Sequence, residues 1–311
     1  MSPLMQDTLE AAPAPVPFLR LDDLWFLLGS RCNLSCIHCY VGSSPTNDDL
    51  EQMTSAEVGT FLEEGMRHGL RHVYLSGGEP FLNAEILPIL EAALEEGREA
   101  TVLTNATRPL ERVLDQVAAL GERAAGRLHL RVSLDHYEEA RHDAIRGRGQ
   151  FRTTVRATLR LARLGLKPIV TTTAEVFRGN PISPAQCEAR YKALFAGQGA
   201  EVAVKILPAT LQMGSQLGRV DRPEEFPVLT EDLLQARRVD KRALMCATGR
   251  SVLKREGRLR VYPCPIIHEV PDFDLGGTLE ESFGREVPLA HRACASYCCR
   301  GTGPKGSCTN G

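Results

Sequence analysis

Short apolar runs alternate with amphipathic stretches through the first two thirds of the chain. The apolar runs have the length of buried strands, and the expected strands cover residues 24–28, 72–75, 100–103, 128–132, 169–173 and 202–207. Stretches with an apolar residue at every third or fourth position separate them and predict helices. Six strand-then-helix units predict an α/β fold whose parallel sheet is wrapped by helices. Because a closed barrel needs eight units, we expect a partial (β/α)6 barrel.

Local signals predict where helices begin and end. Thr54 and Glu57 have the spacing of a capping box, and Gly69 would close the helix that they open. Asn83 is the expected N-cap of a helix that runs to residue 96, and the Ser-Pro pair at 183–184 opens another. The other helical patterns cover residues 110–120 and 151–164.

The pattern changes after about residue 207. We expect a short helix at 230–238 and a hairpin at 251–262 that turns at Glu256 and Gly257. The last 20 residues hold four cysteines and few apolar side chains, so a metal or covalent bonds must organise them if they are ordered. The predicted parts are a flexible N-terminal arm (1–20), a barrel core (21–210), a connector (211–239) and a Cys-rich C-terminal domain (240–311).

Composition narrows the class of protein. Hydrophobic residues make up 43% and charged residues 24%, as in an ordinary folded protein, and the net charge of −2 offers no general attraction for nucleic acid or an anionic membrane. No apolar run approaches the roughly 18 to 20 residues of a spanning helix. No Lys or Arg precedes Arg20, which disfavours a secretory signal peptide. We therefore expect a cytoplasmic protein, in which clustered cysteines bind metal before they form disulfides.

Three of the ten cysteines lie within eight residues, directly after the first expected strand. Cys32, Cys36 and Cys39 are spaced by four and three positions, and three soft thiolates on one loop suit an iron–sulfur cluster or zinc. A cubane with three protein ligands leaves one iron open to another ligand. A structural zinc site completed by His38 or a distant residue is the alternative.

The sequence CNLSCIHCY carries a CX3CX2C motif and resembles the radical S-adenosylmethionine (radical SAM) enzymes. Three later segments, each at the end of an expected strand, strengthen the resemblance: GGEP at 77–80, Thr104-Asn105, and Ser133-Leu-Asp135. The stretch 142–151 resembles one that is common in the peptide-modifying branch. The resemblance covers about residues 22–210. It implies a [4Fe–4S] cluster on Cys32, Cys36 and Cys39 that cleaves SAM to a 5′-deoxyadenosyl radical, which abstracts a substrate hydrogen.

The same resemblance implies which residues contact SAM. Glu79 would hold the methionine ammonium, Ser133 the ribose and Arg146 the methionine carboxylate, while the glycines of GGEP would let the backbone approach the ligand. The full implied set is His38, Tyr40, Ser76, Gly77, Gly78, Glu79, Thr104, Asn105, Ser133, Asp135 and Arg146. Individually, Thr104-Asn105 could instead cap a helix, and Ser133 and Asp135 could be ordinary strand-end residues. His136 stands where many relatives have glycine, and either lines the substrate side or is solvated.

The remaining cysteines form a second group, apart from Cys187, which we expect to be a small buried hydrophobe. The second group is Cys246, Cys264, Cys294, Cys298, Cys299 and Cys308. It resembles a SPASM/twitch extension with auxiliary [4Fe–4S] clusters, but with fewer cysteines than the full SPASM pattern and a compressed final run. We expect one auxiliary cluster on Cys246, Cys264 and two of the last four. The alternatives are two sites, at least one of them incomplete, or a zinc knuckle.

The implied activity is radical modification of a ribosomally made peptide or protein. We expect a flavodoxin- or ferredoxin-type electron donor. Because the chain has no additional N-terminal domain to grip a leader peptide, a peptide substrate would need a separate leader-binding protein or direct recognition. A radical maturase of a small-molecule cofactor or natural product is the second hypothesis. A non-catalytic iron–sulfur carrier or zinc scaffold is the third, and the GGEP element argues against it because a carrier needs no methionine-binding groups.

Overall fold

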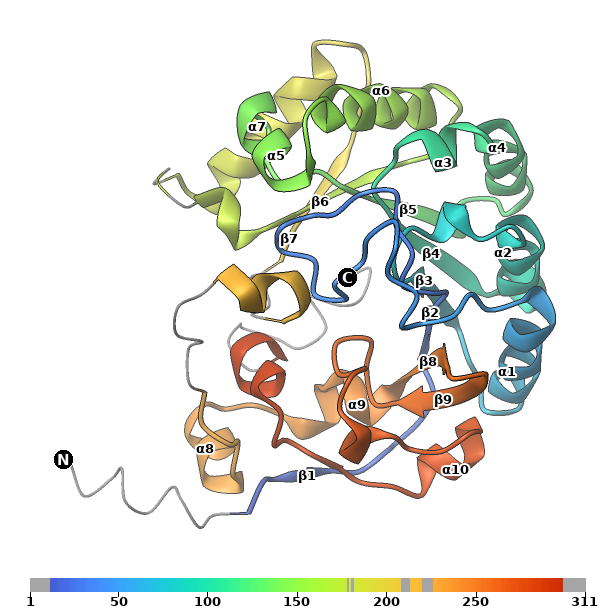
Figure 1. Ribbon diagram of the computed structural model, residues 1–311, viewed down its shortest axis with the longest axis vertical. Coiled ribbons are helices and arrows are strands. Elements are labelled where there is room, and N and C mark those ends of the chain that lie inside the picture. Colours follow the sequence, from blue (N-terminus) through green and yellow to red (C-terminus); the bar gives the residue numbers. More distant parts are fainter. Residues whose placement is uncertain (1–11, 178, 180–181, 208–212, 220–225, 299–311) are drawn as a thin grey trace.

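The computed structural model describes residues 12–177, 179, 182–207, 213–219 and 226–298. Six parallel strands stand side by side in chain order, each within about two residues of its expected bounds. They are β2 (Asp23–Leu27), β3 (His72–Ser76), β4 (Glu99–Thr104), β5 (Leu128–Ser133), β6 (Ile169–Thr173) and β7 (Ala203–Leu207). The sheet curves around the middle of the molecule with helices on its outside (Figure 1). The predicted α/β fold with a mostly parallel central sheet is confirmed, and its open form is consistent with a partial barrel.

The outer helices follow the strands in turn. They are α1 (Ser55–Arg67), α2 (Ile86–Leu94), α3 (Arg108–Glu111), α4 (Leu114–Arg123), α5 (Glu139–Arg146), α6 (Gln150–Arg163) and α7 (Pro184–Ala196). The capping box at Thr54 and Glu57 is present in both directions, and Ser183 forms a second one with Gln186. Both start signals are therefore confirmed.

Two helix predictions need correction. Asn83 is not an N-cap: its Oδ1 accepts from the backbone N–H of Glu85 at 2.8 Å and its Nδ2 donates to the carbonyl of Met53 at 2.8 Å. These bonds fix the loop before α2 rather than the first turn of the helix. The single helix expected at 110–120 is two, α3 and α4, because Val113 between them is not helical. The short helix α5 has no counterpart among the expected elements.

Side chains of the central strands alternate between two apolar clusters, as the period of two requires. Leu24, Phe26 and Leu75 face the outer helices, whereas Trp25 and Leu27 face the inside of the sheet. The inner cluster is completed by C-terminal residues such as Tyr262 and Ile266. The C-terminal part of the chain thus covers the concave face of the sheet where β2 and β3 lie.

The expected hairpin is present as β8 (Gly249–Arg255) and β9 (Arg258–Tyr262). Its turn residues Glu256 and Gly257 both have positive φ, 51° and 70°, as a two-residue hairpin loop of type I′ requires. Strand β8 lies parallel to β2, so the sheet continues to eight strands in the order β7-β6-β5-β4-β3-β2-β8-β9. The hairpin therefore extends the sheet of the barrel, which the sequence did not indicate.

Residues 12–20 are not a loose arm. Strand β1 (Pro15–Val16) pairs with β10 (Val287–Pro288), and Ala14 and Val16 are buried. The sequence did not predict this pairing, because the two strands lie about 270 residues apart in the chain.

The C-terminal part also contains α8 (Glu231–Ala236), α9 (Met245–Thr248), α10 (Leu279–Phe283) and a π-helical turn at Cys294–Cys298. Short 3-10 turns occur at Pro80–Leu82, Glu95–Gly97, Ala174–Phe177, Gly214–Arg219, Lys241–Ala243 and Pro271–Phe273.

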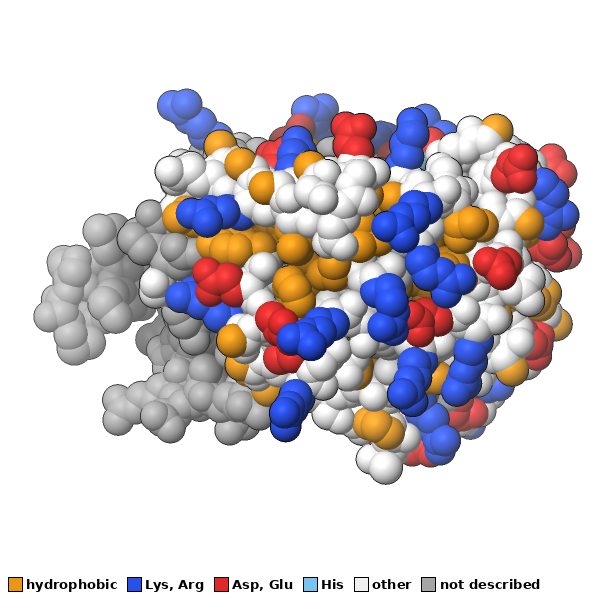
Figure 2. All heavy atoms as spheres, turned by 90° about the horizontal axis from the view of Figure 1, so that it is seen from above, with side chains coloured by type: hydrophobic (Ala, Val, Ile, Leu, Met, Phe, Trp, Pro, Cys, Tyr) orange, Lys and Arg blue, Asp and Glu red, His pale blue; other side chains and the backbone are white. Residues whose placement is uncertain are grey.

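The outer surface matches the balanced composition. Lys and Arg are interspersed with Asp and Glu on the face seen from above (Figure 2). No helix in the described ranges has the length and apolar character needed to cross a membrane.

Candidate active site

A cavity of about 220 Å³ opens at the carboxyl ends of the parallel strands, where open α/β sheets bind ligands. Its wall combines the ends of β3 to β7 with the loop after β2 and two C-terminal segments. The residues predicted for the SAM site that line it are Cys32, Cys36, His38, Cys39, Tyr40, Ser76, Gly77, Gly78, Thr104, Asn105, Ser133, Asp135 and Arg146. Glu79 and His136 do not line it.

The loop after β2 carries the three clustered cysteines. Cys32 and Cys36 are buried and Cys39 is half-buried. The backbone N–H of Leu34 donates to Sγ of Cys32 at 3.4 Å, and that of Ser43 donates to Sγ of Cys39 at 3.3 Å. Burial raises the pKa of Cys32 to about 12 and also raises that of Cys36. Without a metal these thiols are protonated, so metal binding must displace their protons.

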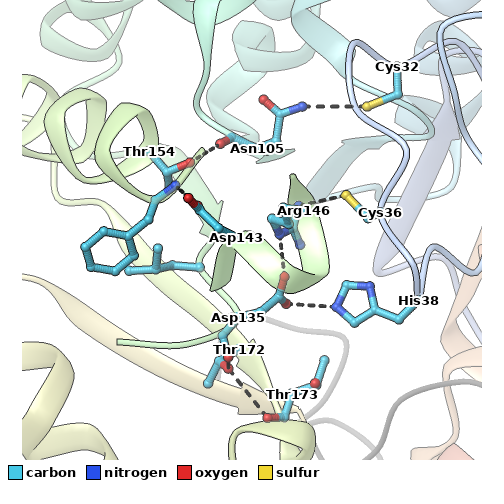
Figure 3. A network of polar contacts seen from close by, with 12 residues as sticks. Cys32, Cys36, His38, Asn105, Asp135, Asp143, Arg146, Thr154, Thr172 and Thr173 are labelled. Carbon is cyan, nitrogen blue, oxygen red and sulfur yellow. Dashed lines mark hydrogen bonds and ion pairs between the residues drawn. The ribbon is translucent and has the colours of Figure 1, made fainter. Parts of the chain in front are cut away.

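Two side chains from other elements also donate to these sulfurs (Figure 3). Nδ2 of Asn105, after β4, lies 3.6 Å from Sγ of Cys32. Nη1 of Arg146, at the end of α5, lies 3.7 Å from Sγ of Cys36. Each of the three cysteines thus accepts at least one N–H···S contact, which is the kind of contact that stabilises a thiolate ligand.

The positions of the three cysteines distinguish an iron–sulfur cluster from a zinc ion. No three His, Cys, Asp or Glu side chains within the described ranges are placed to hold a single metal ion. The thiolates of a cubane each bind a different iron, so they need only face a shared space. Cys32, Cys36 and Cys39 face one cavity. Nε2 of His38, the candidate fourth zinc ligand, lies 3.0 Å from Oδ1 of Asp135 instead. The site fits an iron–sulfur cluster better than a zinc ion.

The two glycines of GGEP are required by close packing of the backbone. Gly77 has a φ of +118°, and a Cβ there would lie 2.4 Å from the carbonyl oxygen of Gly29. A Cβ on Gly78 would lie 2.0 Å from the carbonyl oxygen of Arg31. The glycines therefore let the end of β3 pack against the start of the cysteine loop, in addition to lining the cavity. Contact with a ligand was the reason that the resemblance implied, and an ordinary turn was the alternative.

The carboxylate of Glu79 links the turn after β3 to the end of β4, beside the cavity. It accepts hydrogen bonds from the backbone N–H of Phe81 at 3.2 Å, from Oγ1 of Thr104 at 2.8 Å and from the backbone N–H of Asn105 at 2.8 Å. Burial raises its pKa to about 7, although these hydrogen bonds act in the opposite direction. The structure thus places the Glu79 carboxylate between the ends of β3 and β4, where it fixes Thr104 and Asn105 relative to the cysteine loop.

A buried ionic network closes another side of the cavity (Figure 3). Asp135, just after β5, pairs with Nε of Arg146 and with Nε2 of His38. Its backbone carbonyl accepts from Oγ1 of Thr172 at 2.9 Å. Although burial disfavours ionisation of Asp135, Arg146 and His38 hold its pKa well below the usual range. The ionised Asp135 orients both His38, which belongs to the cysteine loop, and the guanidinium that contacts Cys36.

His136 occupies neither of its predicted environments. It is 3% exposed, and its Nδ1 accepts from the backbone N–H of Glu138 at 2.9 Å. Burial lowers its pKa, so the ring is neutral near pH 7.

The segment 142–151 has a structural function. The carboxylate of Asp143 accepts hydrogen bonds from the backbone N–H groups of Gly149 at 2.6 Å and Phe151 at 2.8 Å, at the start of α6. Cys187 is fully buried, as expected, and burial raises its pKa to about 11.

Sequence reasoning missed part of the cavity wall. The additional lining residues include Trp25, Arg131, Thr171, Thr173, Leu207, Ile266 and Tyr297. Arg131 is 2% exposed, and its Nε donates to Oγ1 of Thr171 at 3.4 Å. A charged residue within an apolar strand was a signal that could have found Arg131, because alternate residues of a strand face the same side. Ile266 and Tyr297 gave no such local signal.

Four of the C-terminal cysteines line a second, smaller cavity. Cys246, Cys264, Cys294 and Cys298 share its wall with apolar side chains such as Leu244, Ile267 and Leu289. Burial raises the pKa of Cys264. Ile266 lines both cavities, so a single side chain belongs to the two walls. Cys299 and Cys308 lie outside the described residues.

Comparison with known proteins identifies the core of the chain. Residues 26–185, about half of the chain, match the family model of the Radical SAM superfamily. The AdoMet-dependent heme synthase of Methanosarcina barkeri is 31% identical over 129 residues, which cover 41% of this chain and 35% of that protein. The antilisterial bacteriocin subtilosin biosynthesis protein AlbA of Bacillus subtilis is 28% identical over 159 residues, 50% of this chain and 33% of AlbA. The matched region is thus only about a third of the length of these relatives.

Solved structures extend the likeness of fold beyond the matched core. Streptococcus suis SuiB bound to the precursor peptide SuiA superimposes with a TM-score of 0.62 at 12% identity, covering 86% of this chain and 65% of SuiB. SuiB bound to S-adenosylmethionine gives a TM-score of 0.55 at 13% identity, with coverages of 83% and 63%. At such identities the likeness concerns the fold.

Proposed function

This chain belongs to the radical SAM superfamily, whose members are enzymes that use a [4Fe–4S] cluster and SAM, and we propose that it modifies a ribosomally made peptide or protein by radical chemistry. The cluster would be held by Cys32, Cys36 and Cys39. The observation that carries this assignment is the convergence of the three thiols on one strand-end cavity, each with an N–H donor directed at its sulfur.

A cluster held by these three cysteines would, when bound, supply the electron for reductive cleavage of SAM and so start the radical chemistry on the substrate. The role of the protein is to bind and orient SAM and the substrate and to exclude water from the cavity. Gly77, Gly78 and Ser133 line the cavity where SAM would lie. His38 and Tyr40 lie on the cysteine loop, on the same wall. Arg146 and Asn105 direct N–H groups at two of the ligand sulfurs.

Glu79 takes a different part in this proposal from the one that the resemblance implied. Its carboxylate is bonded to Phe81, Thr104 and Asn105 and does not line the cavity. We therefore assign recognition of the methionine moiety to the backbone of the GGEP segment rather than to the Glu79 carboxylate. A calorimetric titration of SAM under anaerobic conditions distinguishes the two roles: mutation of Glu79 to Gln should lower stability without abolishing SAM binding.

The radical step is tested by SAM cleavage. The anaerobically reconstituted protein should release 5′-deoxyadenosine when given a strong reductant, and replacement of Cys32, Cys36 and Cys39 by Ala should abolish the release. Cys187→Ala is a matched control, because Cys187 is also a buried cysteine but lies on α7 and does not line the cavity. Equal release by the triple variant and the wild type would show that these cysteines do not hold the active cluster.

The class of substrate is supported by the relatives but is not common to all of them. AlbA is named for the biosynthesis of a bacteriocin, MftC of Mycolicibacterium smegmatis is named as a maturase of mycofactocin, and SuiB has been solved with a precursor peptide. The heme synthase and the GTP 3′,8-cyclase of Listeria welshimeri are named for the small molecules heme and GTP, which keeps a small-molecule maturase as the second candidate. Deuterium transfer from a labelled precursor peptide into 5′-deoxyadenosine would support the first. Transfer only from a small molecule would support the second.

A second cluster would occupy the smaller cavity. We propose that Cys246, Cys264, Cys294 and Cys298 hold an auxiliary [4Fe–4S] cluster, because four buried or half-buried cysteines share one otherwise apolar wall. The reconstituted wild type should contain about eight irons and the triple variant of the first site about four. Zinc in place of iron in that variant would favour the zinc knuckle. Irons well above four would favour two auxiliary clusters, with residues outside the described part as ligands.

We further propose a domain organisation for the chain and two classes of partner protein. Residues 21–210 would form the catalytic core and 240–311 the auxiliary-cluster region, joined by 211–239. A flavodoxin or ferredoxin would supply the electron. A leader-binding protein would be needed if the precursor peptide alone does not bind, and a pull-down of the precursor peptide with and without such a protein tests this. A protein that binds iron but never cleaves SAM would instead be an electron carrier.

A further inference from the structure

Arg250 is a fully buried cation at the start of β8, and the proposed SAM chemistry does not use it. It is the largest fully buried side chain among the described residues. Nη1 donates to the carbonyl oxygens of Cys246 and Gly249, both at 2.8 Å. Nε and Nη2 donate to Oγ and the carbonyl oxygen of Ser282, both at 3.1 Å. The guanidinium carbon lies 4.2 Å from the centre of the Phe18 ring.

These partners are neutral, which leaves the charge of Arg250 uncompensated within the part of the chain that the structure describes. A buried cation without an opposite charge is costly, and a protein normally pairs it or places it beside a bound anion. Burial lowers the pKa of Arg250 to about 10. The geometry connects this cation to the C-terminal cysteine site, because the carbonyl that Nη1 binds at 2.8 Å belongs to Cys246, which shares a cavity wall with Cys264.

Arg98 shows what a purely structural buried arginine looks like in the same protein. It is 4% exposed and donates to the carbonyl oxygens of Ala92 and Ala93 at the end of α2. Two carboxylates, Glu95 and Glu96, belong to the turn that directly precedes Arg98. Arg98 thus has acidic residues beside it in the chain, whereas the hydrogen-bond partners of Arg250 are neutral and one of them belongs to a proposed metal ligand.

We infer that Arg250 is the counter-charge and positioning residue of the C-terminal cysteine site: it fixes the backbone of Cys246 and stabilises the negative charge that Cys246 and Cys264 carry as metal ligands. This inference rests on the proposed auxiliary cluster. A [4Fe–4S] cluster with four thiolates is anionic, and its reduction adds a further negative charge. A fixed cation in a low-dielectric surrounding favours the reduced form, so Arg250 raises the midpoint potential of this cluster and slows its loss of iron.

The test uses the full chain in which Cys32, Cys36 and Cys39 are Ala, so that only the C-terminal site can hold iron. In this parent we compare Arg250→Met, Arg250→Lys and the matched control Arg98→Met. The measurements are iron per chain, the midpoint potential from an EPR-monitored redox titration, the rate of iron loss to a chelator and the thermal unfolding of the apoprotein. None of them depends on activity.

Arg250→Met should lower the midpoint potential and release iron about tenfold faster, since a charged contact is lost. Arg250→Lys keeps the charge and should remain near the parent in potential. Arg98→Met should unfold at a lower temperature with an unchanged potential. If Arg250→Met does not fold, Arg250→Gln, which retains donors toward the carbonyls of Cys246 and Ser282, takes its place. A parent with iron whose potential and iron loss do not change in the Arg250 variants overturns the inference alone. A parent without iron overturns the auxiliary cluster, and the inference with it.

Discussion

Replacement of Asp135 by Asn tests whether the ionic network beside the cavity is organised by one buried carboxylate. The Asp135 side chain is 3% exposed and that of its partner Arg146 is 11% exposed. Asn has the same shape but no charge, so the Arg146 guanidinium would stay buried beside Cys36 without its counterion. Removing one partner of a buried ion pair costs about 3–5 kcal/mol of unfolding free energy. The contact between His38 and Asp135 at 3.0 Å would weaken in the same variant.

The assay is urea unfolding of the apoprotein under reducing, anaerobic conditions at pH 7, followed by circular dichroism. Glu188→Gln is the matched control, because Glu188 pairs with Lys192 at 2.6 Å on α7 but both side chains are about half exposed. Such an exposed pair is worth at most about 1 kcal/mol. If Asp135→Asn loses no more stability than Glu188→Gln, Arg146 is not held by the Asp135 charge, and the reasoning about this network is wrong.

The stability that the Asp135 carboxylate contributes should decrease at low pH. The pKa of Asp135 is lower in the folded than in the unfolded protein, so its contribution is complete above the unfolded pKa and is lost as the pH falls toward the folded one. The difference in stability between the wild type and Asp135→Asn should therefore be constant from about pH 5 to pH 8 and shrink below about pH 4. A difference that instead grows on acidification would contradict the assignment of Asp135 as the ionised partner.

Three further changes probe the rest of the site. Gly78→Ala should prevent normal loading of the first cluster, because the new Cβ would meet the carbonyl oxygen of Arg31 at 2.0 Å; iron analysis should show the loss of about four irons. Glu79→Gln should cost about 2–4 kcal/mol, since an amide cannot accept from all three donors, and urea unfolding measures it. The pKa of Glu79 is raised to about 7, so its protonation stabilises the wild type at low pH and this contribution is lost as the pH rises from about 4.5 through 7; the variant should lack that slope. Asn105→Leu removes one of the two N–H donors to Cys32 and should lower the midpoint potential of the first cluster, whereas an unchanged potential would argue against any influence of this contact.

Local signals in the sequence were sufficient for the elements of the barrel. The strands β2 to β7 were predictable because each contains a short run rich in apolar or β-branched residues, and α1 and α7 because their capping boxes act within four residues. The spacing of Cys32, Cys36 and Cys39 is local too, so the sequence alone brings the three thiols onto one loop. The strand-end segments followed from topology, because the carboxyl ends of parallel strands meet at one edge.

The roles of these residues depend on contacts between segments that are far apart in the chain. Only the tertiary structure shows which residues make those contacts. Arg146 reaches Cys36 across 110 positions, and Glu79 bonds to Thr104 and Asn105 instead of facing the cavity. Strand β8 joins β2, and Arg250 at its start comes to lie against the backbone of Cys246. A periodic pattern reports which face of an element is buried, but not against what. The partner of a buried charge is settled only when the elements pack, because desolvation penalises every arrangement that leaves the charge unpaired.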